Sequence, residues 1–327
     1  MRILVTGSAG HLGEALMRTL PGVGHEPIGV DLQPSPYTHH VGTIADRPFV
    51  YRCMRGVEAV VHAATLHKPH VATHSRQDFV DTNVTGTLNL LEEAAAARVR
   101  AFVYTSTTSA FGRALVPPPG APAAWITEDV TPVPKNIYGV TKVAAEDVCE
   151  LFHQRAALPC LVLRTSRFFP EEDDRKETRE AYADLNAKAN EFLYRRVDVE
   201  DVVSAHLLAL DRAPALGFGR YIVSATTPFT RDDLLELRTD ARSVVARRVP
   251  RHLDIYAARG WSMFPGVDRV YDNARARRDL GWQPRYDFAR ILELVDAEGV
   301  ASSPLARSIG SKGYHSETFT EGPYPVE

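Results

Sequence analysis

The chain contains 327 residues, of which 44% are hydrophobic and 24% are charged. This composition is that of an ordinary soluble globular protein with material for about two domains, and the formal net charge of -3 argues against nucleic acid as a partner. Three cysteines without metal-ligand spacing indicate neither a disulfide framework nor a zinc site, and no apolar stretch approaches the roughly 18 residues that a membrane span needs. We therefore expect a cytoplasmic protein that binds neither a metal nor a membrane.

Short, continuous apolar runs bounded by turn residues recur along the first half of the chain. Such runs are typical of strands that are buried on both faces. They cover residues 2–7, 27–31, 58–64, 101–106 and 160–166, and helical stretches alternate with them at 11–20, 84–99 and 138–154. This alternation predicts an α/β fold, a Rossmann-type doubly wound parallel sheet that binds ligands beyond the carboxyl ends of its strands.

Three glycines follow the first predicted strand, in the stretch TGSAGHLG at residues 6–13. In a dinucleotide-binding fold, one glycine turns the chain, one admits the pyrophosphate and one lets the helix pack on the strand. Gly7, Gly10 and Gly13 are spaced to fill these roles, and the N–H groups at the start of the next helix favour an anion. The pattern predicts a cofactor site that also takes in His11 and Leu12, and a plain glycine turn is the alternative.

Two acidic residues are candidates for the adenosine end of that cofactor. Asp31 ends the second predicted strand, where a carboxylate meets the ribose hydroxyls of NAD and repels the 2′-phosphate of NADP. Its alternative role is that of a turn residue. Asp46, in ADRP, is either an adenine contact or a helix cap before a proline.

A tyrosine and a lysine are spaced four residues apart in the stretch YGVTK. Tyr138 and Lys142 therefore lie on one face of a predicted helix, where the ammonium favours the phenolate and allows the tyrosine to act as a general base. A hydroxyl from Ser106 or Thr107, at the end of a strand, would hold the substrate oxygen beside them. The spacing alone is also common in helices that have no such role.

The sequence pattern changes after residue 165. We predict a dinucleotide-binding domain at residues 1–165, to which 197–225 returns, and a smaller, interleaved C-terminal substrate lobe at 166–196 and 226–300. Residues 301–327 have little periodicity. They are predicted to form a tail that either packs on the body or on a partner subunit, or stays mobile.

Taken together and in this order, these elements resemble the extended short-chain dehydrogenase/reductase family, and within it the NAD-dependent epimerase/dehydratase group. The resemblance covers most of residues 1–300 and includes VVHAAT, TNVTGTLNLLEEA, YTSTTSAFG, VDVEDVVSAHLLAL and RRDLGWQP. It implies NAD as cofactor and a homodimer built from the helices that start near Asn83 and Tyr138.

The resemblance also assigns roles to single residues. It implies that Tyr138 is the base, that Lys142 binds the nicotinamide ribose and lowers the pKa of the tyrosine, and that Thr107 polarises the substrate oxygen, with Thr108 beside it. Further residues are implied beside or behind the cofactor: Ala63, Ala64, Asn83, Tyr104 and Thr105. For Asn83 a helix-start cap is the alternative.

Departures from the family pattern bear on the substrate. Family dehydratases carry an Asp-Glu pair where this chain has Thr108 and Ser109, so sugar 4,6-dehydration is not expected. Arg167 stands where many sugar-nucleotide members have an asparagine, and its planar fork suits an anionic group of the substrate; an ion pair with Glu171 or Glu172 is the alternative.

Three more arginines are candidates for substrate contacts. Arg195 or Arg196 would either face the substrate or pair with Asp198 and Glu200. Arg269 corresponds to a family arginine that reaches the nucleotide diphosphate, and a surface salt bridge is its alternative.

The main prediction is an NAD-dependent nucleoside-diphosphate-sugar epimerase that works through a keto intermediate. The first alternative is a dehydrogenase or reductase of a sugar, a sugar acid or another small carbonyl compound, which would release reduced cofactor. A second alternative, from another class of protein, is a non-catalytic dinucleotide-binding sensor.

Overall fold

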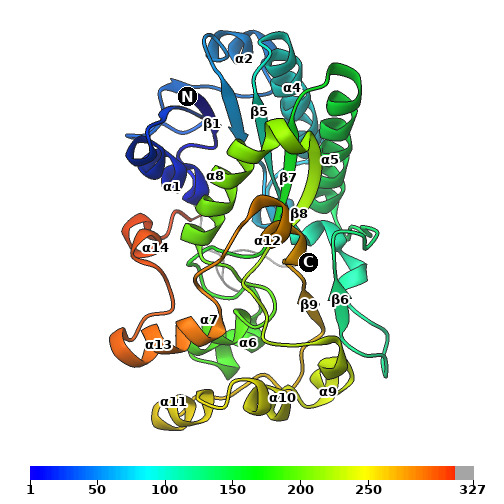
Figure 1. Cartoon of the computed structure of the whole chain (residues 1–327), viewed down its shortest axis with the longest axis vertical. Helices are drawn as coiled ribbons and strands as arrows, with labels where there is room; N and C mark the ends of the chain where they lie inside the picture. The colour runs from blue at the N-terminus through cyan, green and yellow to red at the C-terminus, as the bar shows by residue number, and fades with distance from the viewer. Residues whose placement is uncertain (314–327) are drawn as a thin grey trace.

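The computed structural model describes residues 1–313 and divides them into a sheet domain and a smaller helical part (Figure 1). The sheet has seven strands in the order β3-β2-β1-β4-β5-β7-β8, and every neighbouring pair is parallel. Its strands are β1 (Arg2–Thr6), β2 (Glu26–Asp31), β3 (His40–Val41), β4 (Ala59–His62), β5 (Ala101–Thr107), β7 (Cys160–Thr165) and β8 (Phe218–Val223). The predicted doubly wound parallel sheet is thus confirmed.

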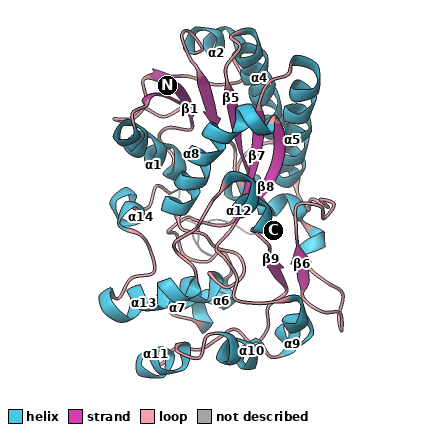
Figure 2. Ribbon diagram, viewed as in Figure 1, coloured by secondary structure: helices cyan, strands magenta, loops and turns pink. Residues whose placement is uncertain are grey.

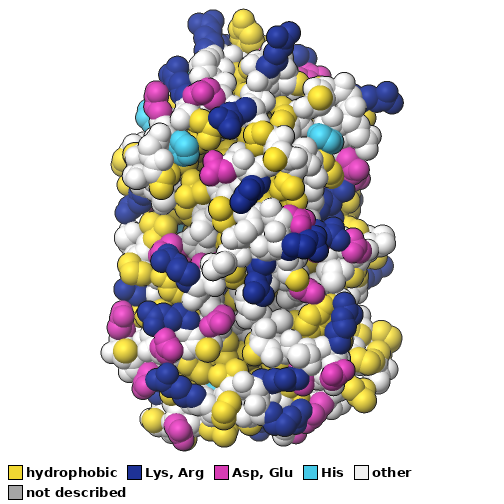
Figure 3. Space-filling model, viewed as in Figure 1, with side chains coloured by type: hydrophobic (Ala, Val, Ile, Leu, Met, Phe, Trp, Pro, Cys, Tyr) yellow, Lys and Arg dark blue, Asp and Glu magenta, His cyan; other side chains and the backbone are white. Residues whose placement is uncertain are grey.

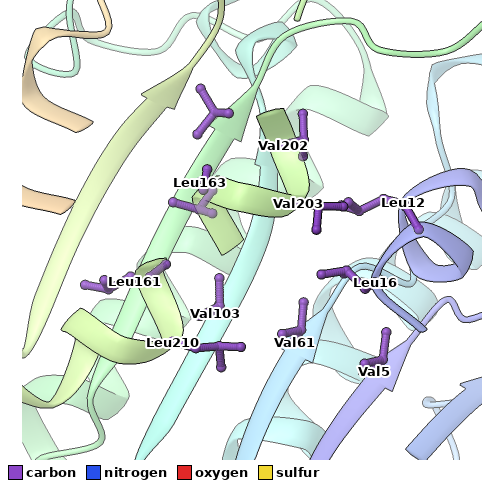
Figure 4. Packing of buried hydrophobic residues seen from close by; sticks show 14 of the residues in the cluster. Val5, Leu12, Leu16, Val61, Val103, Leu161, Leu163, Val202, Val203 and Leu210 are labelled. Carbon is purple, nitrogen blue, oxygen red and sulfur yellow. The ribbon is translucent and has the colours of Figure 1, made fainter. Parts of the chain in front are cut away.

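The sheet is buried on both faces because its strands alternate apolar side chains between two cores. Ile3 and Val5 of β1 belong to the core under α1 (His11–Thr19) and α8 (Val199–Leu216), whereas Leu4 belongs to the core under α2 (Arg47–Cys53), α4 (Gly86–Ala96) and α5 (Ile137–Ala156). Figure 4 shows the first core, where Leu12 and Leu16 of α1 meet Val202, Val203 and Leu210 of α8 over Val5, Val61, Val103, Leu161 and Leu163. Burial on both faces is what the continuous apolar runs predicted.

A second, smaller part lies at the other end of the molecule (Figure 2). A separate apolar core holds it together, formed by Phe192, Val244, Tyr256 and Ile291 among others. Its elements are β6 (Ala124–Ile126), α6 (Lys176–Ala181), α7 (Asp184–Glu191), α9 (Leu234–Thr239), α10 (Ala241–Arg248), α11 (His252–Arg259), β9 (Arg269–Tyr271) and α13 (Phe288–Glu298). Strands β6 and β9 pair in parallel, so a segment from within residues 1–165 also contributes to this part.

Three further α-helices lie within residues 1–313. Helix α3 (Arg76–Phe79) precedes a wide π-type turn at 80–85, and α12 (Ala274–Leu280) and α14 (Pro304–Ile309) lie against the sheet domain. Ala276, Leu280 and Trp282 are fully buried in the core of α1 and α8, so this stretch of the predicted lobe 226–300 packs on the sheet. None of the helices within residues 1–313 is long and apolar enough to cross a membrane.

The strand order places one topological switch at the centre of the sheet. From β1 the chain runs outward to β2 and β3, and it then returns to the other side of β1 with β4. Ligands of open parallel sheets bind at such a point, beyond the carboxyl ends of the strands. The glycine-rich turn at 6–13 directly follows β1 and therefore lies there.

Candidate active site

A cavity of about 690 Å³ opens at the carboxyl ends of the strands. It takes in the glycine turn, the ends of β2, β4, β5 and β7, the first turns of α5, and β9. Of the predicted site residues it is lined by Gly7, Gly10, His11, Leu12, Gly13, Asp31, Ala63, Thr105, Ser106, Thr107, Thr108, Tyr138, Lys142, Arg167, Arg195 and Arg269. The fold thus brings residues from 7 to 269 into one hollow.

The glycine turn is shaped by close backbone contacts. Gly7 has φ +76°, in the left-handed region that favours glycine, and a Cβ there would lie 2.8 Å from the Ala64 nitrogen. A Cβ on Gly13 would overlap the Gly7 carbonyl, so only glycine lets α1 pack this closely on the turn. The start of α1 lines the cavity with Gly10, His11, Leu12 and Gly13, and the N-terminus of a helix after a glycine turn is a position that suits a pyrophosphate.

Asp31 closes the same end of the cavity. Its carboxylate accepts hydrogen bonds from the Ala9 nitrogen (2.9 Å) and the Gln33 nitrogen (2.9 Å), which fixes it against the glycine turn. An anionic group at this position fits ribose hydroxyls and repels a 2′-phosphate.

Four residues that were predicted beside or behind the cofactor do not line the cavity: Asp46, Ala64, Asn83 and Tyr104. Asp46 occupies the N-cap position of α2, yet its side chain makes no cap hydrogen bond. Asn83 is fully buried behind the cavity wall, where it accepts from the Thr65 hydroxyl and the Leu66 nitrogen (both 2.8 Å) and donates to Thr141 (3.1 Å). Asn83 therefore ties the loop after β4 to α5, a role that neither of the two interpretations of the sequence foresaw.

Thr107, Tyr138 and Lys142 meet on one wall of the cavity. Tyr138 lies in the first turn of α5, where Asn136 caps the helix by accepting from the Gly139 nitrogen (3.1 Å). The Lys142 ammonium donates to the Thr105 carbonyl (2.6 Å) and lies 4.1 Å from the centre of the Tyr104 ring. Both residues thus belong to α5, and both side chains are held by β5, Lys142 through the Thr105 carbonyl and Tyr138 through Thr107.

Burial shifts the pKa values of both residues in the direction that favours their neutral forms. It raises the pKa of Tyr138 to about 12, although hydrogen bonding to Thr107 lowers it by a smaller amount. It lowers the pKa of Lys142 to about 7, against the opposing effect of the Glu146 carboxylate. The phenol of Tyr138 therefore stays protonated at neutral pH in the unliganded protein, and a further positive charge is needed to favour the phenolate that acts as a general base.

A buried ion-pair network lies directly behind this wall, and the sequence interpretation missed its centre. Glu146 accepts from the Ser106 hydroxyl (2.5 Å), and Arg164 of β7 donates to both of its oxygens (2.7 to 3.1 Å). Because the Ser106 hydroxyl is directed at Glu146, Thr107 is the strand-end hydroxyl that remains for a substrate. Glu146 follows Lys142 by four residues and so continues the stripe of Tyr138 and Lys142, which is the one signal that the sequence offered.

Arg167 is engaged by the protein itself. Its guanidinium donates to the carbonyls of Glu171 (3.1 Å) and Glu172 (2.6 Å) and lies 3.6 Å from the Asp174 carboxylate. Glu171 and Glu172 are thus the partners that the sequence predicted, but they bind Arg167 through their backbone carbonyls and not through their carboxylates. This geometry favours a structural role for Arg167 over an anion site.

Arg195 and Arg196 also have partners other than those predicted. Arg195 pairs with Asp173 and Glu191, and Arg196 donates to Glu191 (2.7 Å). Neither contact involves Asp198 or Glu200, because Glu191 lies between the two arginines on the preceding helix.

Arg269 differs from these arginines because it has no carboxylate partner within residues 1–313. Its guanidinium lies over the Tyr194 ring (5.4 Å) and the Tyr271 ring (6.0 Å), and its Nε, like that of Arg195, is buried without a hydrogen-bond partner. Lys135 lies nearby, and its pKa is lowered by burial and by the positive charges of Arg269 and Arg175. Within residues 1–313, no ion pair is formed by Lys135, Arg175 or Arg269. Three cations without acidic partners thus converge at one rim of the cavity.

His67 faces Tyr138 across the cavity and was not predicted. Its ring centre lies 6.2 Å from that of Tyr138 and 5.6 Å from that of Phe169. Burial and the neighbouring His70 lower the pKa of His67 to about 3, so the imidazole is neutral and can both donate and accept a hydrogen bond. The stretch LHKPH carried no spacing that would have placed it opposite the tyrosine.

Comparisons with known proteins agree with this arrangement. The sequence profile described as "NAD dependent epimerase/dehydratase family" matches residues 3–223. A UDP-glucose 4-epimerase of Rhizobium meliloti is 27% identical over 330 residues, which cover 89% of this chain and 94% of that protein. An uncharacterized protein of Sinorhizobium fredii is 27% identical, with coverage of 88% and 76%.

Solved structures show the same fold. A short-chain dehydrogenase/reductase superfamily protein from Agrobacterium tumefaciens, solved with bound NAD, superimposes with a TM-score of 0.63 at 26% identity, over 90% of this chain and 95% of that one. The UDP-glucose 4-epimerase of Thermotoga maritima, solved with UDP-glucose, gives a TM-score of 0.62 at 23% identity, with coverage of 90% and 97%.

Proposed function

Because this chain belongs to the NAD-dependent epimerase/dehydratase family, we propose that it is an NAD-dependent epimerase of nucleoside-diphosphate sugars. The observation that carries the proposal is the meeting of Thr107, Tyr138 and Lys142 in the cavity that the glycine turn closes. A dehydrogenase of a sugar or sugar acid, which would use the same three residues, is the second candidate.

The cavity fits NAD. The glycine turn and the start of α1 would hold the pyrophosphate, and Asp31 would accept the adenosine ribose hydroxyls. Lys142 would reach the nicotinamide ribose from the wall that it shares with Tyr138. Bound NAD supplies a reversible hydride acceptor and, in its oxidised form, a positive charge that favours the phenolate of Tyr138.

The protein residues would move one proton and hold one oxygen. Tyr138 removes the proton of the reacting hydroxyl, and Thr107 donates a hydrogen bond to the same oxygen as it becomes a carbonyl. After the ketone has turned over, Tyr138 returns the proton. Lys142 helps Tyr138 to be present both as phenolate, which removes the proton, and as phenol, which returns it. The buried site excludes the water that would otherwise compete for the proton.

The cationic rim supports a nucleotide sugar over a free sugar. Burial lowers the pKa of Lys135, and the positive charges of Arg269 and Arg175 lower it further; a bound diphosphate would offset the repulsion of these charges. The buried Nε of Arg269 would then gain the acceptor that it lacks.

We place the enzyme in the cytoplasm as a homodimer. Cys53, Cys149 and Cys160 are buried and free, as in a reducing compartment. Leu88 on α4 and Val140 on α5 are exposed apolar residues on two helices that contact each other, and a second copy of these helices would cover them. On the face shown in Figure 3, acidic and basic side chains are interspersed, which offers no stripe for a nucleic-acid backbone.

The test incubates the purified enzyme with NAD and a panel of nucleotide sugars, free sugars and uronic acids. We expect a stereoisomer of one nucleotide sugar to form without net NADH, as resolved by chromatography and by NADH absorbance. Stoichiometric NADH with an oxidised product would instead establish the dehydrogenase. Tyr138→Phe is expected to abolish turnover while NAD binding persists; full turnover in this variant would show that Tyr138 is not the base. NAD binding without turnover of any compound in the panel by the wild type would instead leave a dinucleotide-binding role for the site.

A further inference from the structure

The last described residues of the chain form part of the cofactor cavity. Lys312 and Gly313 line it beside Gly10 and His11, although Lys312 and His11 are separated by 301 positions in the sequence. The wall next to the glycine turn is therefore completed by the far end of the chain.

Helix α14 anchors this segment to the sheet domain. Ile309 is buried in the core of α1 and α8, and the Ser303 nitrogen donates to the buried Asp198 carboxylate (2.8 Å). The Ser303 hydroxyl caps the helix by accepting from the Ala306 nitrogen (3.1 Å). The anchor ends before residue 311, so it stays in place whether or not the residues that follow keep their contacts.

Beyond the anchor, polar contacts hold the segment over the place where the start of α1 meets the loop after β7. These two parts already touch, since Nε2 of His11 lies 3.2 Å from the Glu171 carboxylate. The Lys312 nitrogen lies 3.1 Å from the same Nε2, and the Lys312 ammonium pairs with the Glu14 carboxylate of α1. The Ser311 hydroxyl donates to Glu171 (2.8 Å), so the segment covers this contact and is tied to both of its partners.

These contacts can open without disturbing a core. Ser311, Lys312 and Gly313 are exposed, while Ile309 is buried. Gly310, between them, has φ +67°, which favours glycine and suits a pivot. Among the described residues, opening breaks the hydrogen bonds of Ser311, Lys312 and Gly313 and the ion pair between Lys312 and Glu14.

We propose that residues 311–313 are a latch that retains NAD in the site, with Ser311 and Lys312 as its positioning residues and Glu171 and Glu14 as its two catches. NAD enters and leaves with the latch open and is held while it is closed. An epimerase needs such retention, because the cofactor must give back the hydride that it has accepted before it can leave.

The test measures release of the reduced cofactor without any sugar. The double variant Ser311→Ala/Lys312→Met is loaded with NADH, mixed with excess NAD, and followed by NADH fluorescence. We expect release on the order of tenfold faster than from the wild type, since a charge-assisted contact and a hydrogen bond are lost. The matched control is Arg307→Met/Ser308→Ala, which removes the same two groups from α14, outside the cavity.

Two results would overturn the proposal: unchanged release from the latch variant, or equally faster release from the control, which would mean that loosening of α14 is the cause. If the double variant fails to fold, Glu171→Gln weakens the latch from its opposite catch and must also speed release. Because no sugar is present, failure of the epimerase proposal leaves this result unaffected.

Discussion

Single buried charges in the site predict how stability depends on pH. Burial lowers the pKa of Lys142 from 10.5 to about 7, so between these values the unfolded chain binds a proton that the folded chain does not. Stability therefore rises with pH in this window, by up to about 1.4 kcal/mol per pH unit. Lys142→Met should remove this contribution and flatten the slope above neutral pH.

The measurement is urea unfolding of wild type and variant at several pH values from neutral to mildly alkaline. Lys188→Met, which removes a lysine paired with Asp184 on α7, is the control and should keep the wild-type slope. Identical slopes in all three proteins would show that Lys142 is charged in the folded state.

A second residue-scale prediction concerns the buried Glu146. Glu146→Gln leaves Arg164, which is 3% exposed, without its counter-ion, and losing one partner of a buried pair costs about 3–5 kcal/mol. Glu150→Gln, one turn further along α5, breaks a surface contact with Arg220 and should cost less than about 1 kcal/mol. Chemical denaturation compares the two; equal losses would contradict the central place of Glu146.

At the scale of elements, the packing of the glycine turn on α1 predicts a sharp contrast between two glycines. Gly13→Ala would push α1 away from the turn, because its Cβ would overlap the Gly7 backbone, whereas a Cβ on Gly22 meets nothing within 4 Å. We expect Gly13→Ala to weaken NAD binding by at least about tenfold, on the order of 1.4 kcal/mol, and Gly22→Ala to leave it unchanged. Calorimetric titration with NAD measures both; comparable affinities would remove the case for a pyrophosphate at this turn.

Helices α4 and α5 carry the prediction on assembly. Val140 is 51% exposed on α5, and a charge there should prevent two copies from packing through these helices. Val140→Arg is expected to sediment as a monomer at micromolar concentration, while the wild type and Leu235→Arg, which is 63% exposed on α9, remain dimers. A wild-type monomer would refute the dimer outright.

At the scale of the whole molecule, the sheet and the catalytic wall could be predicted because their signals are local. Apolar runs mark the strands, and a spacing of four puts Tyr138 and Lys142 on one helix face. The directions of other side chains left no such mark. Arg167 turns to carbonyls of its own loop, whereas His67 meets Tyr138 across the cavity and Arg269 reaches the rim from β9. Side chains of these types form ion pairs as readily as they bind ligands, so only the folded arrangement distinguishes the two roles.

The cavity wall that joins His11 to Lys312 also sets the order of events during synthesis. A ribosome that adds about 5–20 residues per second needs roughly 15–60 s to make the 301 residues between them. Strand β1 is made first, and its two neighbours in the sheet, β2 and β4, are made after it. A nascent chain therefore carries an unfinished cofactor site until Lys312 has been made. The wall beside the glycine turn can form only once that residue has left the exit tunnel.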